Sequence, residues 1–241
     1  MMQALKRYVL AQQFNPGLVG LLVNPFYHAR RGLHRAIAEM APRLEGRLLD
    51  VGCGRKPYQS LFPAIEYIGL EIDTPENRGR KQADYYYNGE SFPFTEQHFD
   101  GVICNQVLEH VFTPDRFLGE IHRVLKPGGK LLLTIPFVWD EHEQPWDYAR
   151  YSSFGLKRLL EKNGFEVAEQ YKINADVRVL FQLINAYLYK VLRTDQQIVN
   201  LLVCVLVMAP FNILGALLYR LLPANPDLYL DQLVLARKVA D

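Results

Sequence analysis

The chain has 241 residues, enough for one domain with an appendage, and 49% of them are hydrophobic, which suffices for a buried core. Its formal net charge of +1 excludes the strong field that attracts nucleic acid, so we expect no nucleic-acid partner. The cysteines Cys53, Cys104 and Cys204 are too few and too scattered for a disulfide framework or a cysteine zinc site, which favours a reducing compartment.

The first 45 residues are expected to form a peripheral helical segment. Asn24-Pro25 begins a predicted helix, because proline is favoured at the first helical position, where an N–H would have no partner inside the helix. Residues 26–44 continue this helix. The pattern predicts a helix that packs on the face of a sheet.

The most informative stretch is residues 48–54, with the sequence LLDVGCG. Two aliphatic residues and Asp50 end a predicted buried parallel strand, and the glycines that follow let the backbone turn sharply and approach a ligand closely. A second predicted strand, residues 67–70, ends in Glu71. This layout predicts a nucleoside-binding crevice at the carboxyl edge of the sheet, with an acid placed to bind ribose hydroxyls.

Two phosphate-binding motifs are absent from the sequence. A dinucleotide fingerprint needs a third glycine, and Pro57 occupies that position. The phosphate loop that ends in Gly-Lys-Ser or Gly-Lys-Thr is missing as well. The crevice is therefore predicted to bind a nucleoside other than a dinucleotide or a nucleoside triphosphate.

Strands and helices alternate along the middle of the chain. We predict strands over residues 47–51, 66–71, 84–87, 100–104, 129–135 and 165–170, with helices near 57–63, 114–125 and 153–163. Such alternation implies a parallel sheet covered by helices on both faces. A last strand is expected over 228–238.

Six segments together resemble the class I S-adenosylmethionine-dependent methyltransferases, in particular bacterial methyltransferase-domain proteins. The resemblance covers roughly residues 45–175 and rests on residues 48–58, 67–73, 92–94, 99–104, 108–111 and 123–136. It implies an α/β fold with a doubly wound, seven-stranded Rossmann-like sheet whose last strand is antiparallel at the edge. It also implies S-adenosyl-L-methionine as cofactor, methyl transfer as the reaction, and the N-terminal helices as a cap over the cofactor.

The predicted cofactor-binding residues begin at the first two strands. Asp50 is expected to fix the glycine turn and to reach the methionine ammonium through water, while Gly52 and Gly54 permit close backbone approach. Glu71 can accept both ribose hydroxyls through its two carboxylate oxygens. Asp73 is the alternative ribose ligand, and a plain surface acid at a strand end is the alternative for Asp50 and Glu71.

The remaining cofactor contacts are predicted further along the chain. The family places an acid about four residues before the segment at Phe92, and here that position holds Asn88, which can pair with the adenine amino edge. Asp84 is the alternative, and Asn88-Gly89 could also be a simple turn. Asn105 and Gln106 follow the fourth strand, where cofactor and substrate should meet.

A polar segment after the fifth strand supplies the predicted catalytic residues. His142 can take a proton from a hydroxyl, and Arg150 can hold a phosphate or carboxylate with two parallel hydrogen bonds. The alternative is a loop that an Asp147–Arg150 pair holds in shape. Aromatic side chains predicted to stack on a sugar or ring are Trp146, Tyr148 and Tyr151.

No metal is expected in this segment. His142 with Glu141 and Glu143 lacks the helical spacing of a zinc site, and no second histidine stands nearby in the sequence. The triplet that contains Glu109 and His110 is widespread in the family across varied substrates. We therefore expect these two residues to anchor a helix and a loop.

An apolar segment interrupts the core between residues 176 and 224. No charged residue occurs from Gln196 to Tyr219, a length sufficient to span a membrane. Asn200, Asn212 and the central Pro210 argue against a single span. We expect a helical hairpin bent near Pro210.

Three interpretations remain for what this hairpin contacts. Residues 196–220 are expected to contact a membrane surface, and the alternatives are packing within the protein or in a homo-oligomer, and a full span. The predicted organisation is an N-terminal cap (1–45), a core (46–175), the hydrophobic insertion (176–224) and a final core strand (225–241).

The predicted function is O-methylation of a sugar, a lipid-linked glycan or an isoprenoid-type acceptor. The Asn/Asp-Pro-Pro-Tyr motif common among enzymes with nitrogen acceptors is absent. The alternative is a membrane-associated S-adenosylmethionine-binding scaffold protein without turnover. We expect a cytoplasmic protein, peripheral on the inner face of the membrane.

Overall fold

The computed structural model describes residues 12–80 and 82–239, which form two compact units. One unit, here called the sheet unit, contains Ala36–Phe137, Glu141–Tyr171 and the chain from Gln232 onward. The other, the helical unit, contains the chain up to Arg35, Val138–Asp140 and Lys172–Asp231. The first 11 residues of the predicted N-terminal cap lie outside the described residues.

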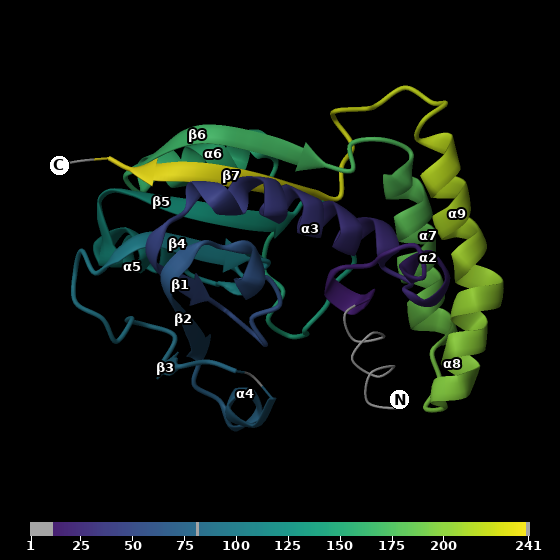
Figure 1. Cartoon of the computed structure of the whole chain (residues 1–241), viewed down its shortest axis with the longest axis horizontal. Coiled ribbons are helices and arrows are strands. Elements are labelled where there is room, and N and C mark those ends of the chain that lie inside the picture. Colours follow the sequence, from purple (N-terminus) through teal and green to yellow (C-terminus); the bar gives the residue numbers. More distant parts are fainter. Residues whose placement is uncertain (1–11, 81, 240–241) are drawn as a thin grey trace. The chain divides into compact units, whose positions relative to one another are not determined.

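A seven-stranded sheet forms the centre of the sheet unit. Its strands in spatial order are β3 (Tyr85–Tyr87), β2 (Ala64–Ile72), β1 (Gly46–Val51), β4 (Phe99–Asn105), β5 (Leu125–Pro136), β7 (Asp231–Lys238) and β6 (Phe165–Ile173). The first five of these strands run parallel to one another. Figure 1 shows β7 running in the opposite direction, so the sheet is mixed. The predicted Rossmann-like fold is thereby confirmed.

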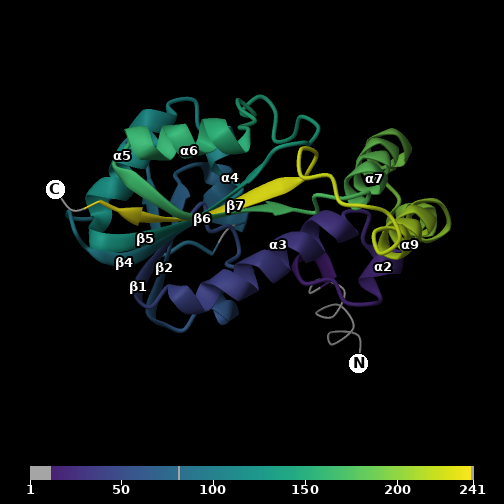
Figure 2. The same cartoon turned by 90° about the horizontal axis from the view of Figure 1, so that it is seen from above.

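Helices cover both faces of this sheet (Figure 2). On one face lie α5 (Pro114–Val124) and α6 (Ser153–Lys162), and on the other lies the C-terminal part of α3 (Tyr27–Met40). Side chains from both layers are almost completely buried, among them Leu118 and Ile121 of α5, Leu156 and Leu160 of α6, and Ile37 and Met40 of α3. The burial of these apolar faces is the main force that holds the layers together.

Three details of the predicted core are corrected by the structure. The last strand is not at the edge, because β7 lies between β5 and β6 and β6 is the edge strand. The predicted helix over 57–63 is only a 3-10 turn, Gln59–Leu61. A short helix, α4 (Pro75–Arg80), was not predicted and connects β2 to β3.

The helical unit has α2 (Gly20–Val23), the start of α3, α7 (Arg178–Leu192) and one long apolar helix. The long helix consists of α8 (Gln197–Val203), a π-helical segment (Cys204–Met208) and α9 (Ala209–Leu218). The predicted bend near Pro210 is therefore wrong, and the hairpin turns between α7 and α8 instead. Proline has no N–H to donate, and the π segment directly before α9 accommodates Pro210 without ending the helix.

Buried amides hold the helical unit together. Asn212 of α9 donates to the carbonyl oxygens of Leu21 (3.0 Å) and Asn24 (2.9 Å), and its own Oδ1 accepts from Asn185 of α7 (2.9 Å). Gln182 of α7 accepts the backbone N–H groups of His28 (3.0 Å) and Ala29 (3.2 Å). Asn212, one of the two asparagines that argued against a membrane span, thus faces the interior and is fully buried with hydrogen-bond partners.

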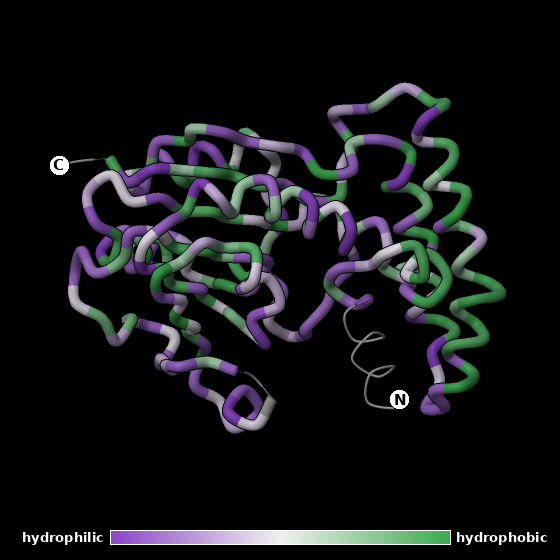
Figure 3. Tube along the Cα trace, in the orientation of Figure 1, coloured by the Kyte–Doolittle hydropathy of each residue, from purple (hydrophilic) through white to green (hydrophobic). Residues whose placement is uncertain are grey.

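The opposite side of the long helix exposes apolar side chains. The segment Gln197–Leu218 is long and apolar enough to cross a membrane, with a mean hydropathy of 2.5, and Figure 3 marks most of it as hydrophobic. Exposed residues along it are Ile198, Leu201, Leu202, Leu206, Ile213, Leu214 and Leu217. They recur at helical spacing, so they form one apolar stripe.

Candidate functional site

The glycine turn after β1 and the acid at the end of β2 lie against each other. The N–H groups of Gly52 and Cys53 donate to the carbonyl oxygen of Leu70, at 2.9 and 3.3 Å. The N–H of Gly54 donates to Oε2 of Glu71 at 3.1 Å. The structure therefore brings together the glycine turn after β1 and the carboxylate of Glu71, which the sequence predicted at the ends of two neighbouring strands.

Glycine is required at position 52 for two reasons. Its φ of +69° lies in the left-handed region that side chains disfavour, and a Cβ added there would lie 2.4 Å from Cγ2 of Val107. Gly54 also has a positive φ, +56°. The chain can make this tight turn under the end of β4 only because residue 52 has no side chain.

Asp50 is buried beside the turn. The hydroxyl of Tyr67 donates to Oδ2 of Asp50 at 2.8 Å. Burial raises the pKa of Asp50 to about 7; the Tyr67 hydrogen bond opposes this rise, and the negative charge of Glu71 adds to it. Asp50 is thus a carboxyl group that a cationic ligand would convert to its charged form.

The alternative acids are occupied by contacts within the protein. Asp73 makes two hydrogen bonds to Arg78, at 2.6 and 2.8 Å, on the surface. Asp84 accepts the N–H of Gly69 at 2.7 Å and the ammonium of Lys56 at 2.5 Å, which ties β2 to the residues after the glycine turn. No role for Lys56 was predicted from the sequence. In the structure its backbone has a φ of +52°, a conformation that nothing in the local sequence indicates.

Asn88 forms the turn that was its alternative interpretation. Its Oδ1 accepts the backbone N–H groups of Glu90 and Ser91, at 2.9 and 3.2 Å, and Gly89 has a φ of +84°. An asparagine that accepts from the backbone two residues on is typical of such turns. The adenine contact of Asn88 remains a prediction.

Asn105 and Gln106 are held at the end of β4 by a residue that sequence reasoning missed. Thr134, buried at the end of β5, donates its hydroxyl to Oδ1 of Asn105 at 2.6 Å, and its carbonyl oxygen accepts the N–H of Gln106 at 3.0 Å. Gln106 has a φ of +55°, a strained conformation for a residue with a side chain. The sequence does contain a signal for this role, because Thr134 is a polar residue within an otherwise aliphatic strand.

These residues fit an adenosyl group with an amino-acid tail. Glu71 offers acceptors for hydroxyls at the end of β2, and the next residue, Ile72, is 41% exposed and provides an apolar surface for a base. Asp50 provides the group that favours a cation, and the turn at Gly52 provides backbone without side chain. A phosphate would be repelled here, because the carboxyl groups of Asp50 and Glu71 already interact unfavourably with each other.

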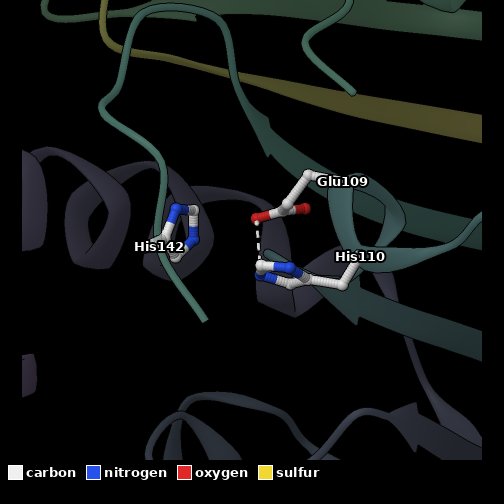
Figure 4. A group of neighbouring side chains, drawn as sticks. All are labelled: Glu109, His110 and His142. Carbon is white, nitrogen blue, oxygen red and sulfur yellow. Dashed lines mark ion pairs between the residues drawn. The ribbon is translucent and has the colours of Figure 1, made fainter. Parts of the chain in front are cut away.

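A second polar cluster lies at the ends of β4 and β5. Glu109 and His110 belong to the 3-10 turn Leu108–His110 after β4, and His142 comes from the segment after β5. The ring centroids of His110 and His142 are 4.8 Å apart, and Nε2 of His110 is 3.9 Å from Oε1 of Glu109 (Figure 4). The second histidine that the sequence did not place near His142 is therefore present.

The segment after β5 is fixed by Asp147. Its carboxylate makes two hydrogen bonds to Arg150, at 2.5 and 2.7 Å, and accepts the backbone N–H of His142 at 2.9 Å. The hydrogen bonds from Arg150 hold the pKa of Asp147 down at about 2. Arg150 thus makes the pair that was the alternative to anion binding, and its role toward a substrate remains a prediction.

Aromatic side chains surround this cluster on the surface. Trp146 is 61% exposed and Tyr148 44% exposed, and Tyr148 packs edge to face on Phe112, which is 77% exposed. Phe112 was not predicted to take part. Tyr151, which was predicted to stack with Trp146 and Tyr148, packs instead against the core of the sheet unit, and the exposed aromatic rings here are those of Phe112, Trp146 and Tyr148.

Comparison with known proteins places this geometry in context. A family model described as a methyltransferase domain matches residues 26–170. The chain is 33% identical over 94 residues to the tRNA (carboxymethyluridine(34)-5-O)-methyltransferase of Arabidopsis thaliana. The aligned region covers 36% of this chain. The match spans only 23% of the plant protein.

Solved structures share the fold at low sequence identity. The cyclase SpnF has a TM-score of 0.56 and 21% identity, with 89% of this chain and 84% of that chain covered. Phosphoethanolamine N-methyltransferase 2 of Haemonchus contortus, in complex with S-adenosyl-L-methionine, has a TM-score of 0.53 and 18% identity, with 96% and 59% covered. Both have the same fold as this chain.

Proposed function

The chain belongs to the methyltransferase-domain family, and from that premise we propose that it is an S-adenosylmethionine-dependent methyltransferase that methylates a hydroxyl oxygen of a sugar, a lipid-linked glycan or an isoprenoid-type acceptor. The observation that carries this proposal is the His142–Asp147 pair. Nδ1 of His142 lies 3.3 Å from Oδ2 of Asp147. Nη2 of Arg150 also lies 3.5 Å from Nδ1, but the carboxylate is nearer and favours the tautomer in which Nδ1 carries the proton and Nε2 keeps its lone pair.

Bound S-adenosylmethionine supplies a methyl group activated by its sulfonium. Glu71 would accept the ribose hydroxyls, and Asp50 would reach the ammonium through water. His142 would accept the acceptor's hydroxyl proton on Nε2, so that the oxygen can take up the methyl group. Asp147 stabilises the imidazolium that results, because Arg150 keeps this carboxylate ionised.

Three further observations support the acceptor class. The exposed rings of Phe112, Trp146 and Tyr148 offer flat, rigid surfaces to a sugar or a ring beside the cluster. The name of the Arabidopsis relative specifies methylation of an oxygen. An apolar groove of about 660 Å³ runs between α7 and the long helix within the helical unit, and its lining by residues such as Leu183, Tyr187 and Phe211 suits an aliphatic chain.

The proposal includes attachment of the helical unit to a membrane surface. The long helix presents its apolar stripe outward, and α7 exposes Leu180, Ile184, Tyr187 and Val191 at helical spacing. Both helices border the same apolar groove. A lipid surface is the occupant that suits two exposed apolar stripes on one small unit.

Mass spectrometry of lipid and glycan extracts tests the function. Cells that lack the gene should accumulate a species lighter by one CH2, and the wild-type gene should restore the heavier species. His142→Ala should lower turnover by about 10²–10⁴, the range for loss of a general base, while S-adenosylmethionine binding persists. His98→Ala, at the start of β4, is the matched control. Near-normal turnover of His142→Ala, or a missing methyl group on nitrogen or carbon, would overturn the proposal.

A further inference from the structure

The cluster of Glu109, His110 and His142 has the composition of a metal site. Each residue offers one ligand atom, and these atoms all lie within 4.8 Å of one another. Two come from the 3-10 turn after β4 and one from the segment after β5, and Figure 4 shows the three side chains side by side. One carboxylate with two imidazoles is a ligand set that zinc and other divalent transition metals use.

The hydrogen bonds around both histidines orient their other nitrogens toward the cluster. Nδ1 of His110 lies 2.7 Å from the carbonyl oxygen of Trp146, which can only accept, so Nδ1 carries the proton and Nε2 the lone pair. Nδ1 of His142 is engaged by Oδ2 of Asp147 at 3.3 Å and by Nη2 of Arg150 at 3.5 Å, which leaves Nε2 as the ring nitrogen available to an ion. Histidines that ligate metals almost always donate their second N–H to a carbonyl or carboxylate in this way.

The backbone fixes the two segments to each other. The N–H groups of Tyr148 and Ala149 donate to the carbonyl oxygen of Glu109, at 2.8 and 3.2 Å. The side chain of Glu109 is fully buried, whereas those of His110 and His142 are 17% and 30% exposed. The site is therefore held by the protein on one side and open to an incoming ion on the other.

We propose that Glu109, His110 and His142 bind a divalent transition-metal ion, Zn²⁺ in the first instance, through one carboxylate oxygen and two Nε2 atoms. With bonds of about 2.1 Å, tetrahedral ligand atoms lie about 3.4 Å apart, so small side-chain rotations close the site. Three protein ligands leave the fourth position open.

The ion has a consequence that rests on the proposed function. Nε2 of His142 is the atom proposed to accept the acceptor's proton, and one lone pair cannot serve both. A bound ion therefore inhibits methyl transfer, and the metal-free protein, obtained by treatment with a chelator, is the active form.

Binding of Co²⁺ and Zn²⁺ to the purified full-length chain tests the site without any acceptor. We expect one Co²⁺ per chain with the visible absorption of a tetrahedral site, displaced by one Zn²⁺. Asp147→Asn should weaken the affinity roughly 10–100-fold, and Glu109→Gln and His110→Gln should weaken it further. His98→Gln is the matched control. Circular dichroism establishes that each variant is folded.

Three outcomes would overturn different parts of this proposal. Equal Co²⁺ affinity of wild type and His110→Gln would show that the ion binds elsewhere, and absence of binding would remove the site; neither result bears on methyl transfer. Binding without inhibition by Zn²⁺ would keep the site and overturn the antagonism and the base role of His142.

Discussion

The backbone N–H of Gly54 donates to Oε2 of Glu71 at 3.1 Å, so the turn after β1 and the acid near the end of β2 hold each other in place. A carboxylate fixed in this way loses little conformational freedom when it accepts further hydrogen bonds from a ligand. The affinity for the cofactor should therefore depend strongly on this one side chain.

Glu71→Ala is expected to weaken S-adenosylmethionine binding by about 1.5–3 kcal/mol, the range for hydrogen bonds to a charged group. Isothermal titration calorimetry measures the dissociation constant. Glu66→Ala is the matched control, because Glu66 lies at the other end of β2 and pairs with Arg47 on the surface. An unchanged dissociation constant for Glu71→Ala would exclude the ribose contact.

Cofactor binding should strengthen as the pH rises from 6 to about 7.5. The pKa of Asp50 is about 7, so this carboxyl gains its charge across that interval, and a cationic ammonium favours the charged form. The gain should be about five- to tenfold, at pH values where the ligand's α-ammonium keeps its proton (its pKa is about 7.7–8.0). Calorimetry at several pH values measures it.

Two variants define the sign of this pH dependence. Asp50→Asn should abolish it. Tyr67→Phe removes a hydrogen bond to the carboxylate, so it should raise the pKa of Asp50 and move the midpoint to higher pH. A midpoint that moves down, or affinity that falls with rising pH, would contradict the assignment of Asp50.

Gly52→Ala should destabilise the sheet unit. The positive φ alone costs about 1–2 kcal/mol for a residue with a side chain, and the new Cβ would lie 2.4 Å from Val107. Denaturant unfolding measures the loss. In the Gly52→Ala/Val107→Ala double variant the clash is relieved and the φ strain stays, so only part of the loss should return. A single variant as stable as wild type would refute the account of the turn.

The contact between the glycine turn and Glu71 was predictable because its signals are local. Residues 48–54 and Glu71 each end a short apolar run, and parallel strands end at one edge of a sheet, so their proximity follows from the pattern. The pairing of Asp147 with Arg150 was foreseen as an alternative for the same reason, since the two residues are three apart.

The cluster of His110 with His142 was not predictable from spacing. It depends on a loop that folds back until the N–H groups of Tyr148 and Ala149 reach the carbonyl oxygen of Glu109, and no periodicity encodes such a return. The predicted bend at Pro210 was wrong for another reason. Proline cannot donate one of the helical hydrogen bonds, which is why a bend was predicted. The π-helical segment before α9 accommodates Pro210, and the helix continues through it.

Asn212→Leu should strongly destabilise the helical unit. The substitution leaves the carbonyl oxygens of Leu21 and Asn24 and the amide of Asn185 without this partner in a buried place. At about 1–3 kcal/mol for each buried group, the expected loss in free energy of unfolding is about 3 kcal/mol or more. Asn200→Leu, on the same helix but bonded at the exposed turn, should cost less than about 1 kcal/mol. Urea unfolding compares the two, and equal stabilities would refute the role of the network.

Charges placed on the apolar stripe of the long helix should release the protein from lipid vesicles. Ile198 and Leu206 are 76% and 70% exposed, so lysine at these positions leaves the packing of the helical unit intact. Burial of a large aliphatic side chain contributes about 1.5–3 kcal/mol, so the Ile198→Lys/Leu206→Lys variant should lower vesicle partitioning by about 100-fold or more. Flotation with phosphatidylcholine vesicles, with and without anionic lipid, measures it.

Ile65→Lys is the control for this membrane test, because Ile65 is 91% exposed but lies on β2 in the sheet unit. Its partitioning should equal that of wild type. Analytical ultracentrifugation distinguishes the competing explanation for the stripe. If wild-type protein does not float and the double lysine variant instead dissociates an oligomer, the stripe is a contact between copies of the chain, and the membrane proposal is wrong.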